Sequence, residues 1–323
     1  MTYDRSIDCP HTPGENPLWQ ESDCYWFYDE TSGVGGFNRL GQRPSKETGQ
    51  LQLFLFKKGG KRFSLQDEDV PGSDCARWET GQRVGNATAE SLEDMNVRWT
   101  WDEPNCSGEL EFYDSFYEPR DWTKKKENDA ISNTMNDGGH LECSGRVKGI
   151  VRIGTETFQI NGLAHRDRSW GARDHNVVRQ HRMYTGTVGP ALSWATATMQ
   201  FRGGQSVNFG FVVVDGVEYD IENLECLAEV AFDTYSVKRG TLIVTYDGGK
   251  HLEISARSVQ GFVTNMFGMT STDHIATVTY GSHAGFCDLE ASFLLGGHST
   301  PPTPEEVFLA CNELGLSDCS DYG

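Results

Sequence analysis

The sequence of 323 residues has no apolar run that approaches the length of a membrane span, and its polar start lacks the apolar core of a secretion signal. Positive charge is also scarce, because 28 lysines and arginines stand against 47 aspartates and glutamates, for a formal net charge of -19. A chain this acidic repels nucleic acid and anionic membrane surfaces. We therefore expect no nucleic-acid partner, no membrane span and a cytoplasmic location.

The nine cysteines include no C-x-x-C pair, and their odd number and wide scatter from Cys9 to Cys319 are typical of reduced thiols. The sequence also lacks a Gly-x-Gly-x-x-Gly fingerprint, a phosphate loop and a Gly-x-Ser-x-Gly elbow. His175 and His181 stand six positions apart, which matches no common metal-binding spacing. We therefore expect no nucleotide or other cofactor, no metal and no serine-hydrolase mechanism.

The order of apolar and polar residues in the sequence is typical of β-strands. Apolar and polar residues alternate in segments 51–58, 97–103 and 108–114. Glycine-containing turns recur between such segments, as at Asp215-Gly216, where tight hairpins require positive φ angles. Aromatic residues make up 11% of the chain, which is enough to supply a core. The pattern predicts an all-β protein, and the length suits either two domains or one large β domain.

Strong helix signals occur only near the end of the sequence, in residues 303–314. Thr303 is a candidate N-cap, Pro304 suits the first helical position, and Glu306 completes a capping box. These signals predict one C-terminal helix. The polar stretch 121–140 contains few apolar residues and predicts a long loop.

The charged segment Gly162–Asp174, with the sequence GLAHRDRSWGARD, breaks the alternation of a strand with one exposed face. Its arginines and aspartates match one another as bidentate ion pairs, and Trp170 offers an aromatic face to an arginine. One interpretation is a buried ionic clasp between sheets that performs no chemistry, because paired charges tolerate burial. The other is a general acid in an apolar pocket, where burial shifts the pKa of a carboxylic acid or histidine towards neutrality.

Two further pairs of ionisable residues have strand spacing. His140 and Glu142 are two positions apart and share a strand face, either as an acid–base dyad or as a hydrogen-bonded structural pair. Asp288 and Glu290 have the same spacing, and the simplest interpretation for them is a solvated face. If arginines saturate the acids of the central segment, Asp288 and Glu290 become the next candidates for an acid.

Two blocks of the sequence resemble a known family. Residues 21–44 (ESDCYWFYDETSGVGGFNRLGQRP) resemble its opening, and residues 140–174 resemble its central block, whose usual form is Gly-x-x-Arg-Asp-His-Ser-Trp-Gly-x-Arg-Asp. The family comprises bacterial proteins grouped with the carotenoid 1,2-hydratase and AttH-like superfamily, and the resemblance spans most of the chain. Arg168 stands where the family commonly has histidine, so the resemblance implies no proton-transfer role at this position.

The resemblance implies two lipocalin-like antiparallel β-barrels, or half-barrels, packed side by side as domains 1–163 and 164–323, with the terminal helix in the second. It also implies relatives that hydrate, cyclise or rearrange hydrophobic isoprenoid or polyketide substrates without an organic cofactor. On this arrangement the charged segment lies at the junction of the domains, and domain interfaces are common places for small-molecule pockets.

We therefore expect a cofactor-independent enzyme that binds a small hydrophobic, terpenoid-like molecule and hydrates, dehydrates or isomerises it by acid–base chemistry. The alternatives are a cyclase or pericyclase that folds a polyene or polyketide, and a non-catalytic lipid- or terpenoid-binding protein. The predicted catalytic residues are Asp167 and His165 with Glu142 and Asp174 in support, the predicted substrate-binding residues are Trp170, Trp194, Tyr184 and His140, and the predicted structural ion-pairing residues are Arg166 and Arg173.

Overall fold

The computed structural model describes residues 3–122, 138–231, 236–266 and 269–293. The chain divides into two compact units, one within residues 1–174 and the other within residues 175–323. Both are built from consecutive antiparallel strands. The helical segments among the described residues are short 3₁₀ turns: η1 (Arg5–Asp8), η2 (Pro44–Lys46), η3 (Gly72–Asp74) and η5 (His175–Val177).

The first unit is one antiparallel sheet of twelve strands. Neighbouring strands pair in the order β4-β3-β2-β1-β12-β11-β9-β8-β7-β6-β5, and β10 pairs with β11. The strands are β1 (Trp19–Asp29), β2 (Val34–Arg43), β3 (Thr48–Lys57), β4 (Arg62–Pro71), β5 (Cys75–Trp78), β6 (Gly81–Val84), β7 (Ala87–Ser91), β8 (Val97–Glu103), β9 (Cys106–Tyr113), β10 (Arg120–Asp121), β11 (Gly139–Ile153) and β12 (Glu156–Ala172).

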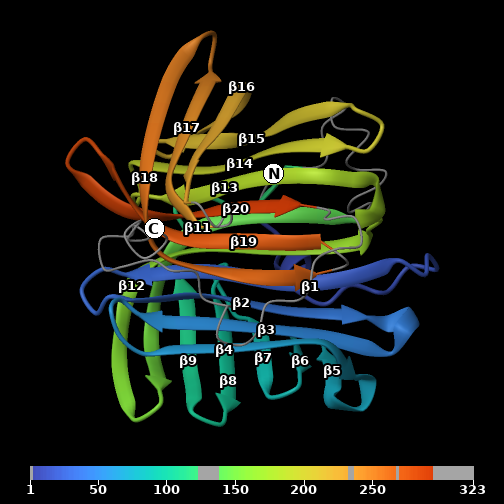
Figure 1. Cartoon of the computed structure of the whole chain (residues 1–323). Helices are drawn as coiled ribbons and strands as arrows, with labels where there is room; N and C mark the ends of the chain where they lie inside the picture. The colour runs from blue at the N-terminus through green and yellow to red at the C-terminus, as the bar shows by residue number, and fades with distance from the viewer. Residues whose placement is uncertain (1–2, 123–137, 232–235, 267–268, 294–323) are drawn as a thin grey trace. The chain divides into compact units, whose positions relative to one another are not determined.

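The two edges of this sheet, β4 and β5, are connected only by the 3₁₀ turn η3. The sheet must therefore curl until its edges approach each other. Gln42 connects β2 to the opposite end of the sheet, because its amide donates hydrogen bonds to the carbonyls of Ala76 at 3.0 Å and Arg83 at 3.3 Å. The short strands β6–β9 accordingly run across the direction of β2–β4 (Figure 1). The result is a nearly closed barrel.

Aromatic side chains fill the interior of the curled sheet. Tyr25 from β1 stacks on Trp99 from β8 with ring centroids 3.8 Å apart, and Phe112 from β9 meets Trp99 edge-on. Burial of each large apolar side chain stabilises the fold by on the order of 2 kcal/mol. Because β1 and β8 lie far apart in the sheet order, the contact between Tyr25 and Trp99 joins the two halves of the barrel.

The longest hairpin of the first unit is formed by β11 and β12. Its register runs from Gly139 opposite Trp170 to Ile153 opposite Glu156, and Gly154 makes the turn with a φ of 63° that glycine adopts readily. On its other edge β12 pairs with β1. The charged segment therefore lies on a central strand that is hydrogen-bonded along both edges.

The second unit is a closed eight-stranded barrel in which each strand pairs with the next in sequence and β13 pairs with β20. The same strands are labelled in Figure 1. They are β13 (Val178–Thr187), β14 (Leu192–Phe201), β15 (Ser206–Val214), β16 (Val217–Val230), β17 (Val237–Tyr246), β18 (Lys250–Met266), β19 (Met269–Tyr280) and β20 (His283–Phe293).

Apolar side chains of the described residues pack the interior of this closed barrel. Trp194 and Tyr184 are each 1% exposed and belong to one core cluster with Leu242 and Leu289. The hydroxyl of Tyr184 donates to the carbonyl of Leu227 at 3.1 Å, which satisfies its polar end. An eight-stranded barrel is just wide enough to be filled by side chains, and here they fill it.

The prediction of an all-β chain with two lipocalin-like barrels is confirmed, with the first barrel nearly closed and the second closed. The three segments with the clearest alternation, 51–58, 97–103 and 108–114, correspond to β3, β8 and β9. The boundary between the two compact units lies after Asp174, whereas the predicted boundary at 163–164 falls inside β12.

The predicted C-terminal helix at 303–314 lies outside the described residues, as does most of the predicted loop at 121–140. Within the described residues, no helix has both the length and the apolar character that crossing a bilayer requires.

Gly210 of β15 lies opposite Thr196 with a φ of 141°, and a Cβ there would be 2.3 Å from the carbonyl oxygen of Ala195. We expect Gly210→Ala to lower the free energy of unfolding by about 2 kcal/mol or more, because backbone strain and steric overlap act together. Urea unfolding followed by tryptophan fluorescence measures the loss. Gly203→Ala is the matched control, since an added Cβ there meets no atom within 4 Å. Equal stability of the two variants would contradict the backbone strain and the close contact that we describe at Gly210.

Candidate functional site

The pairing of β11 with β12 lines up ionisable residues from two parts of the sequence. Glu142 lies directly opposite Asp167, and Ser144 lies directly opposite His165. Because alternate residues of a strand share a face, His140 lies on that same face. We call these five residues, His140, Glu142, Ser144, His165 and Asp167, the β11–β12 cluster.

Three hydrogen bonds and one ion-pair contact, between Glu142 and His140, join the members of the β11–β12 cluster. One carboxylate oxygen of Glu142 lies 2.6 Å from Nε2 of His165, and the other lies 3.1 Å from Nε2 of His140. Nε2 of His140 also lies 2.8 Å from Oδ2 of Asp167. At the other end, the hydroxyl of Ser144 lies 2.8 Å from Nδ1 of His165. Each imidazole ring is therefore in hydrogen-bond contact with at least one carboxylate.

Burial differs among the members of this cluster. Glu142, Ser144 and His165 are 0% exposed, whereas the side chain of His140 is 14% exposed. The indole ring of Trp122 meets the imidazole of His140 edge-on, with ring centroids 5.2 Å apart. His140 is thus the member of the β11–β12 cluster that is most accessible to another molecule, and it has an aromatic neighbour.

The electrostatics of the cluster favour a protonated His140. Burial by itself lowers the pKa of His140. The carboxylates of Asp167 and Glu142 raise this pKa by more than burial lowers it, so that it lies at about 9. Burial raises the pKa of Asp167, but the neighbouring His140 cation and the charge of Arg173 together hold it below its ordinary value. At neutral pH the site therefore presents an imidazolium ion held by carboxylates.

The arginines at positions 166 and 168 lie on the opposite face of β12. Arg166 forms a bidentate ion pair with Asp8 at 2.7 and 2.8 Å, and Arg168 pairs with Glu21 at 2.6 Å and with Asp23. The ion pair of Arg166 fits the structural role predicted for it, but its partner Asp8 lies outside the segment 162–174, whose own aspartates we expected as partners. Neighbouring residues of a strand point to opposite faces, so they do not pair with each other.

Trp170 shares the face of Arg168 and stacks on the imidazole of His11, with ring centroids 3.7 Å apart and an interplanar angle of 9°. Trp170, which we predicted as a substrate-binding residue, therefore lies on the face of β12 opposite the β11–β12 cluster. Asp174 follows the end of β12 and is half-buried.

Trp194 and Tyr184, the other predicted substrate-binding residues, lie in the core of the closed barrel, as described above. Of the predicted site residues, the structure brings four into one cluster of hydrogen-bond and ion-pair contacts: His140, Glu142, His165 and Asp167.

Sequence reasoning missed Ser144 and Trp122. Ser144, like His140, is two positions from Glu142 in the sequence. Strand alternation therefore already predicts that Ser144 shares the face of Glu142. Trp122 follows β10 and approaches His140 because β10 pairs with β11. No local pattern in the sequence indicates that pairing.

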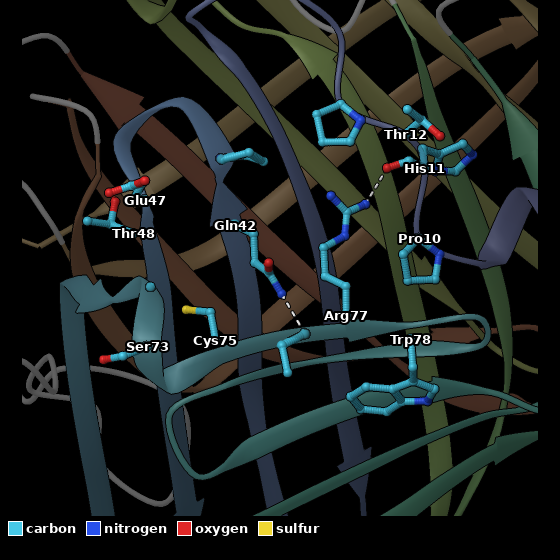
Figure 2. Close-up of a pocket in the computed structure, with 14 residues that line it drawn as sticks. Pro10, His11, Thr12, Gln42, Glu47, Thr48, Ser73, Cys75, Arg77 and Trp78 are labelled. Carbon is cyan, nitrogen blue, oxygen red and sulfur yellow. Dashed lines mark hydrogen bonds between the residues drawn. The ribbon is translucent and has the colours of Figure 1, made fainter.

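A hollow of about 880 Å³ opens in the first unit beside the edge strand β5. Prolines and Trp78 line it together with polar side chains, among them Gln42, Arg77 and His11, and Arg77 donates to the backbone carbonyl of His11 (Figure 2). Because His11 stacks on Trp170, the hollow belongs to the face of β12 opposite the β11–β12 cluster. None of the predicted catalytic residues lines it.

A second group of acids lies in the second unit. Asp288 and Glu290 share a face of β20, but they are 0% and 8% exposed, so the interpretation as a solvated face is wrong. His181 of β13 lies 2.7 Å from Glu290. Burial, and then the charges of Asp273 and Glu290, raise the pKa of Asp288 well above its ordinary value.

Both groups of acids have the donor spacing of a metal site. Among the described residues, two sets have donor atoms within 4.8 Å of one another: His140, Glu142 and Asp167 in the first unit, and Asp273, Asp288 and Glu290 in the second. In the first set, Nε2 of His140 is already engaged with Asp167, which favours a proton over a metal ion there.

Solved structures share this fold at low sequence identity. An AttH candidate from Nitrosomonas europaea aligns with a TM-score of 0.57 and 12% identity, over 89% of this chain and 98% of that one. CghA with Sch210972 aligns with a TM-score of 0.62 and 12% identity, over 90% and 95%. Kievitone hydratase from Nectria haematococca aligns with a TM-score of 0.55 and 9% identity, over 90% and 92%. At these identities the likenesses show the fold alone.

No curated protein sequence matches this chain. A family model described as "Domain of unknown function (DUF7064)" matches residues 4–294, which covers most of the first compact unit and residues 175–294 of the second. The match covers most of the chain, so the protein belongs to the DUF7064 family.

Proposed function

We propose that this protein is a cofactor-independent enzyme that hydrates, dehydrates or isomerises a small hydrophobic molecule, with the β11–β12 cluster as its acid–base centre. The observation that carries this proposal is the cluster of two histidines and two carboxylates joined by contacts of 2.6 to 3.1 Å, in which His140 keeps some exposure. The carboxylates raise the pKa of His140 to about 9, which favours its charged form at neutral pH. Kievitone hydratase, which shares the fold, is by its name a hydratase, and this supports the reaction class.

His140 is the proton donor in this proposal. Its imidazolium ion transfers a proton to an alkene carbon or to an allylic hydroxyl, and a carbocation forms on the substrate. In hydration, water attacks the cation and its proton returns to the neutral ring of His140. In dehydration the same steps run in reverse, and in isomerisation a neighbouring carbon loses the proton. The ring is restored in each case, so no cofactor is consumed.

The other members of the cluster position His140 and tune its pKa. Asp167 accepts from Nε2 and keeps the ring charged, and Glu142 links His140 to His165. The hydroxyl of Ser144 fixes the orientation of the His165 ring. His165, which we expected to be catalytic, and Glu142, which we expected in a supporting role, are fully buried and act in this proposal through His140.

The substrate class follows from the surroundings of His140. The indole of Trp122 lies beside the ring, and an aromatic face stabilises a carbocation by the same quadrupole attraction that binds ammonium groups. A terpenoid or prenylated aromatic alkene, which forms a tertiary or allylic cation on protonation, suits this environment. A cyclase that acts by folding its substrate would need the pocket shape but not the proton on His140.

The hollow beside β5 supports a second candidate function, the binding of a small molecule without conversion. Its volume of about 880 Å³ is within the range of ligand sites. Its lining combines apolar surfaces from Pro13, Pro44 and Trp78 with the polar groups of Gln42 and Arg77. An amphipathic ligand with one polar end fits this combination.

We expect His140→Asn to reduce turnover by at least about 100-fold, because general acid catalysis of this kind contributes factors of 100 to 10,000. Turnover is measured by mass spectrometry after incubation with terpenoid and prenylated aromatic alkenes in heavy water, since protonation at carbon introduces deuterium. His251→Asn, a change at an exposed histidine, is the matched control. Product formation without deuterium, with small effects from His140→Asn and Asp167→Asn, would support the cyclase alternative.

The pKa of His140 is testable without a substrate. NMR titration of the ring protons should give a midpoint near 9, above the ordinary value of 6.5. Because the folded-state pKa is raised, the stabilisation from the charged ring is complete below pH 6.5 and is lost as the pH rises through about 9. In Asp167→Asn the midpoint of the His140 titration should fall. The reason is that the variant loses the carboxylate that raises the pKa of His140 most, whereas burial still lowers it. A wild-type midpoint at or below 6.5 would exclude His140 as a proton donor at neutral pH.

For the second candidate, we expect Trp78→Ala to weaken the binding of a fluorescent fatty acid or terpenoid probe by about 10-fold, because the indole supplies apolar surface at the rim. Fluorescence titration measures the dissociation constant. Leu227→Ala, at an exposed leucine of the second unit, is the control. Probe binding that responds to neither change would remove the hollow as a binding site.

A further inference from the structure

Two strands of the closed barrel, β19 and β20, carry a buried acidic cluster that the proposed function does not use. Carboxylate oxygens of Asp273, Asp288 and Glu290 lie within 4.8 Å of one another. The three residues are 3%, 0% and 8% exposed. Carboxylates this close repel one another strongly when they are removed from water, so the cluster requires a compensating positive charge or proton.

Glu290 is held in place through one of its two oxygens. Oε1 lies 2.7 Å from Nε2 of His181 and accepts from the hydroxyls of Ser271 at 3.1 Å and Ser292 at 3.3 Å. Among the described residues, these hydrogen bonds all go to Oε1, which leaves Oε2 for another partner. Carboxylates that bind metal ions are commonly oriented in this way by outer hydrogen bonds.

Two buried side chains beside Glu290 lack hydrogen bonds to the described residues. Neither oxygen of Asp288 has a hydrogen-bond partner of good geometry there, although the backbone amides of His274 and Leu289 lie nearby. The hydroxyl of Thr185, which is 0% exposed, has no partner in the same part of the chain. Thr185 lies directly opposite Asp288 in the pairing of β13 with β20, so both side chains lie on one face. A shared partner between them would satisfy both groups.

We propose that Asp273, Asp288, Glu290 and the hydroxyl of Thr185 bind one divalent cation. The donor atoms are all oxygens, which hard cations prefer. A divalent charge offsets two of the three carboxylates, and His181 donates to the third.

The neighbouring Arg182 does not compensate these acids, because it lies on the other face of β13. There its guanidinium donates to the carbonyl of Cys226 at 2.7 Å.

The donor set indicates the class of ion. Four protein oxygens leave room for water ligands, which suits the octahedral coordination of Mg²⁺ or Mn²⁺ better than the higher coordination of Ca²⁺. Water reaches His181, the neighbour of Glu290, since its side chain is 18% exposed and lines a surface hollow of about 240 Å³.

The bound ion has a structural role. It connects β13 to β20, the pair of strands that closes the barrel, and it adds β19 through Asp273. Because this site shares no residue with the β11–β12 cluster, the proposed reaction does not pass through the ion.

The test is a titration of the full chain with Mn²⁺ after removal of metals by a chelator. Isothermal calorimetry should show one ion per chain, and the melting temperature should rise with Mn²⁺ concentration because the ion binds only the folded state. Asp288→Asn, which keeps the shape of the side chain and removes its charge, should weaken binding by at least about 10-fold. Mg²⁺ should compete with Mn²⁺ for the same site.

Two control variants distinguish this site from the other acidic groups of the chain. Glu225→Gln removes one exposed acidic charge from the same barrel and should leave Mn²⁺ binding unchanged. Glu142→Gln alters the donor set of the first unit and should also leave binding unchanged. If circular dichroism shows that Asp288→Asn does not fold, Thr185→Val takes its place, with a weakening of several-fold expected.

Three results would overturn the proposal. The first is the absence of both heat and thermal shift up to millimolar Mn²⁺, which would mean that a proton neutralises Asp288. The second is wild-type affinity in the folded Asp288→Asn or Thr185→Val variant. The third is loss of binding in Glu142→Gln alone, which would place the ion in the first unit.

Discussion

The antiparallel register between β11 and β12 is the constraint on which the candidate site depends. Cross-strand neighbours in such a pair are close enough for their side chains to bond, and the pairing sets Glu142 opposite Asp167 and Ser144 opposite His165. A shift of one residue would turn every member of the cluster to the other face. The register is set by the tight turn at Gly154 and by the pairing of β12 with β1 on its other edge. The fold thus holds the chemical groups by backbone hydrogen bonds and not by a flexible loop.

The two faces of β12 carry different kinds of charge. On one face, Arg166 and Arg168 are matched by Asp8 and Glu21, so the arginines tie the amino-terminal segment and β1 to the sheet. On the other face, the histidines meet carboxylates through short hydrogen bonds, so a proton can be held and exchanged there. The ionic-clasp interpretation therefore applies to the face that carries Arg166 and Arg168, and the acid–base centre that we propose lies on the alternate residues of the same strand.

The second unit also carries buried ionisable residues. Its interior is apolar, and its buried acids lie on β20 and β19 beside the strand pair that closes the barrel. A closed barrel needs no edge strand, but its last pairing joins strands that are far apart in sequence, and the entropy cost of bringing them together is correspondingly large. Groups that bridge β13 and β20, such as His181 with Glu290, stabilise the barrel at that pairing.

The sequence by itself determined the all-β class, the positions of the clearest strands and the turns, because alternation and glycine-containing turns are local properties. It also identified His140, Glu142, His165 and Asp167 as ionisable residues with strand spacing, although it did not assign their partners. Only the tertiary structure decided that Arg166 pairs with Asp8, that Trp194 belongs to a core, and that Asp288 is buried. The physical reason is that a period of two residues specifies which side chains share a face, whereas the strand that lies alongside, and the solvent it excludes, depend on pairings between distant parts of the chain.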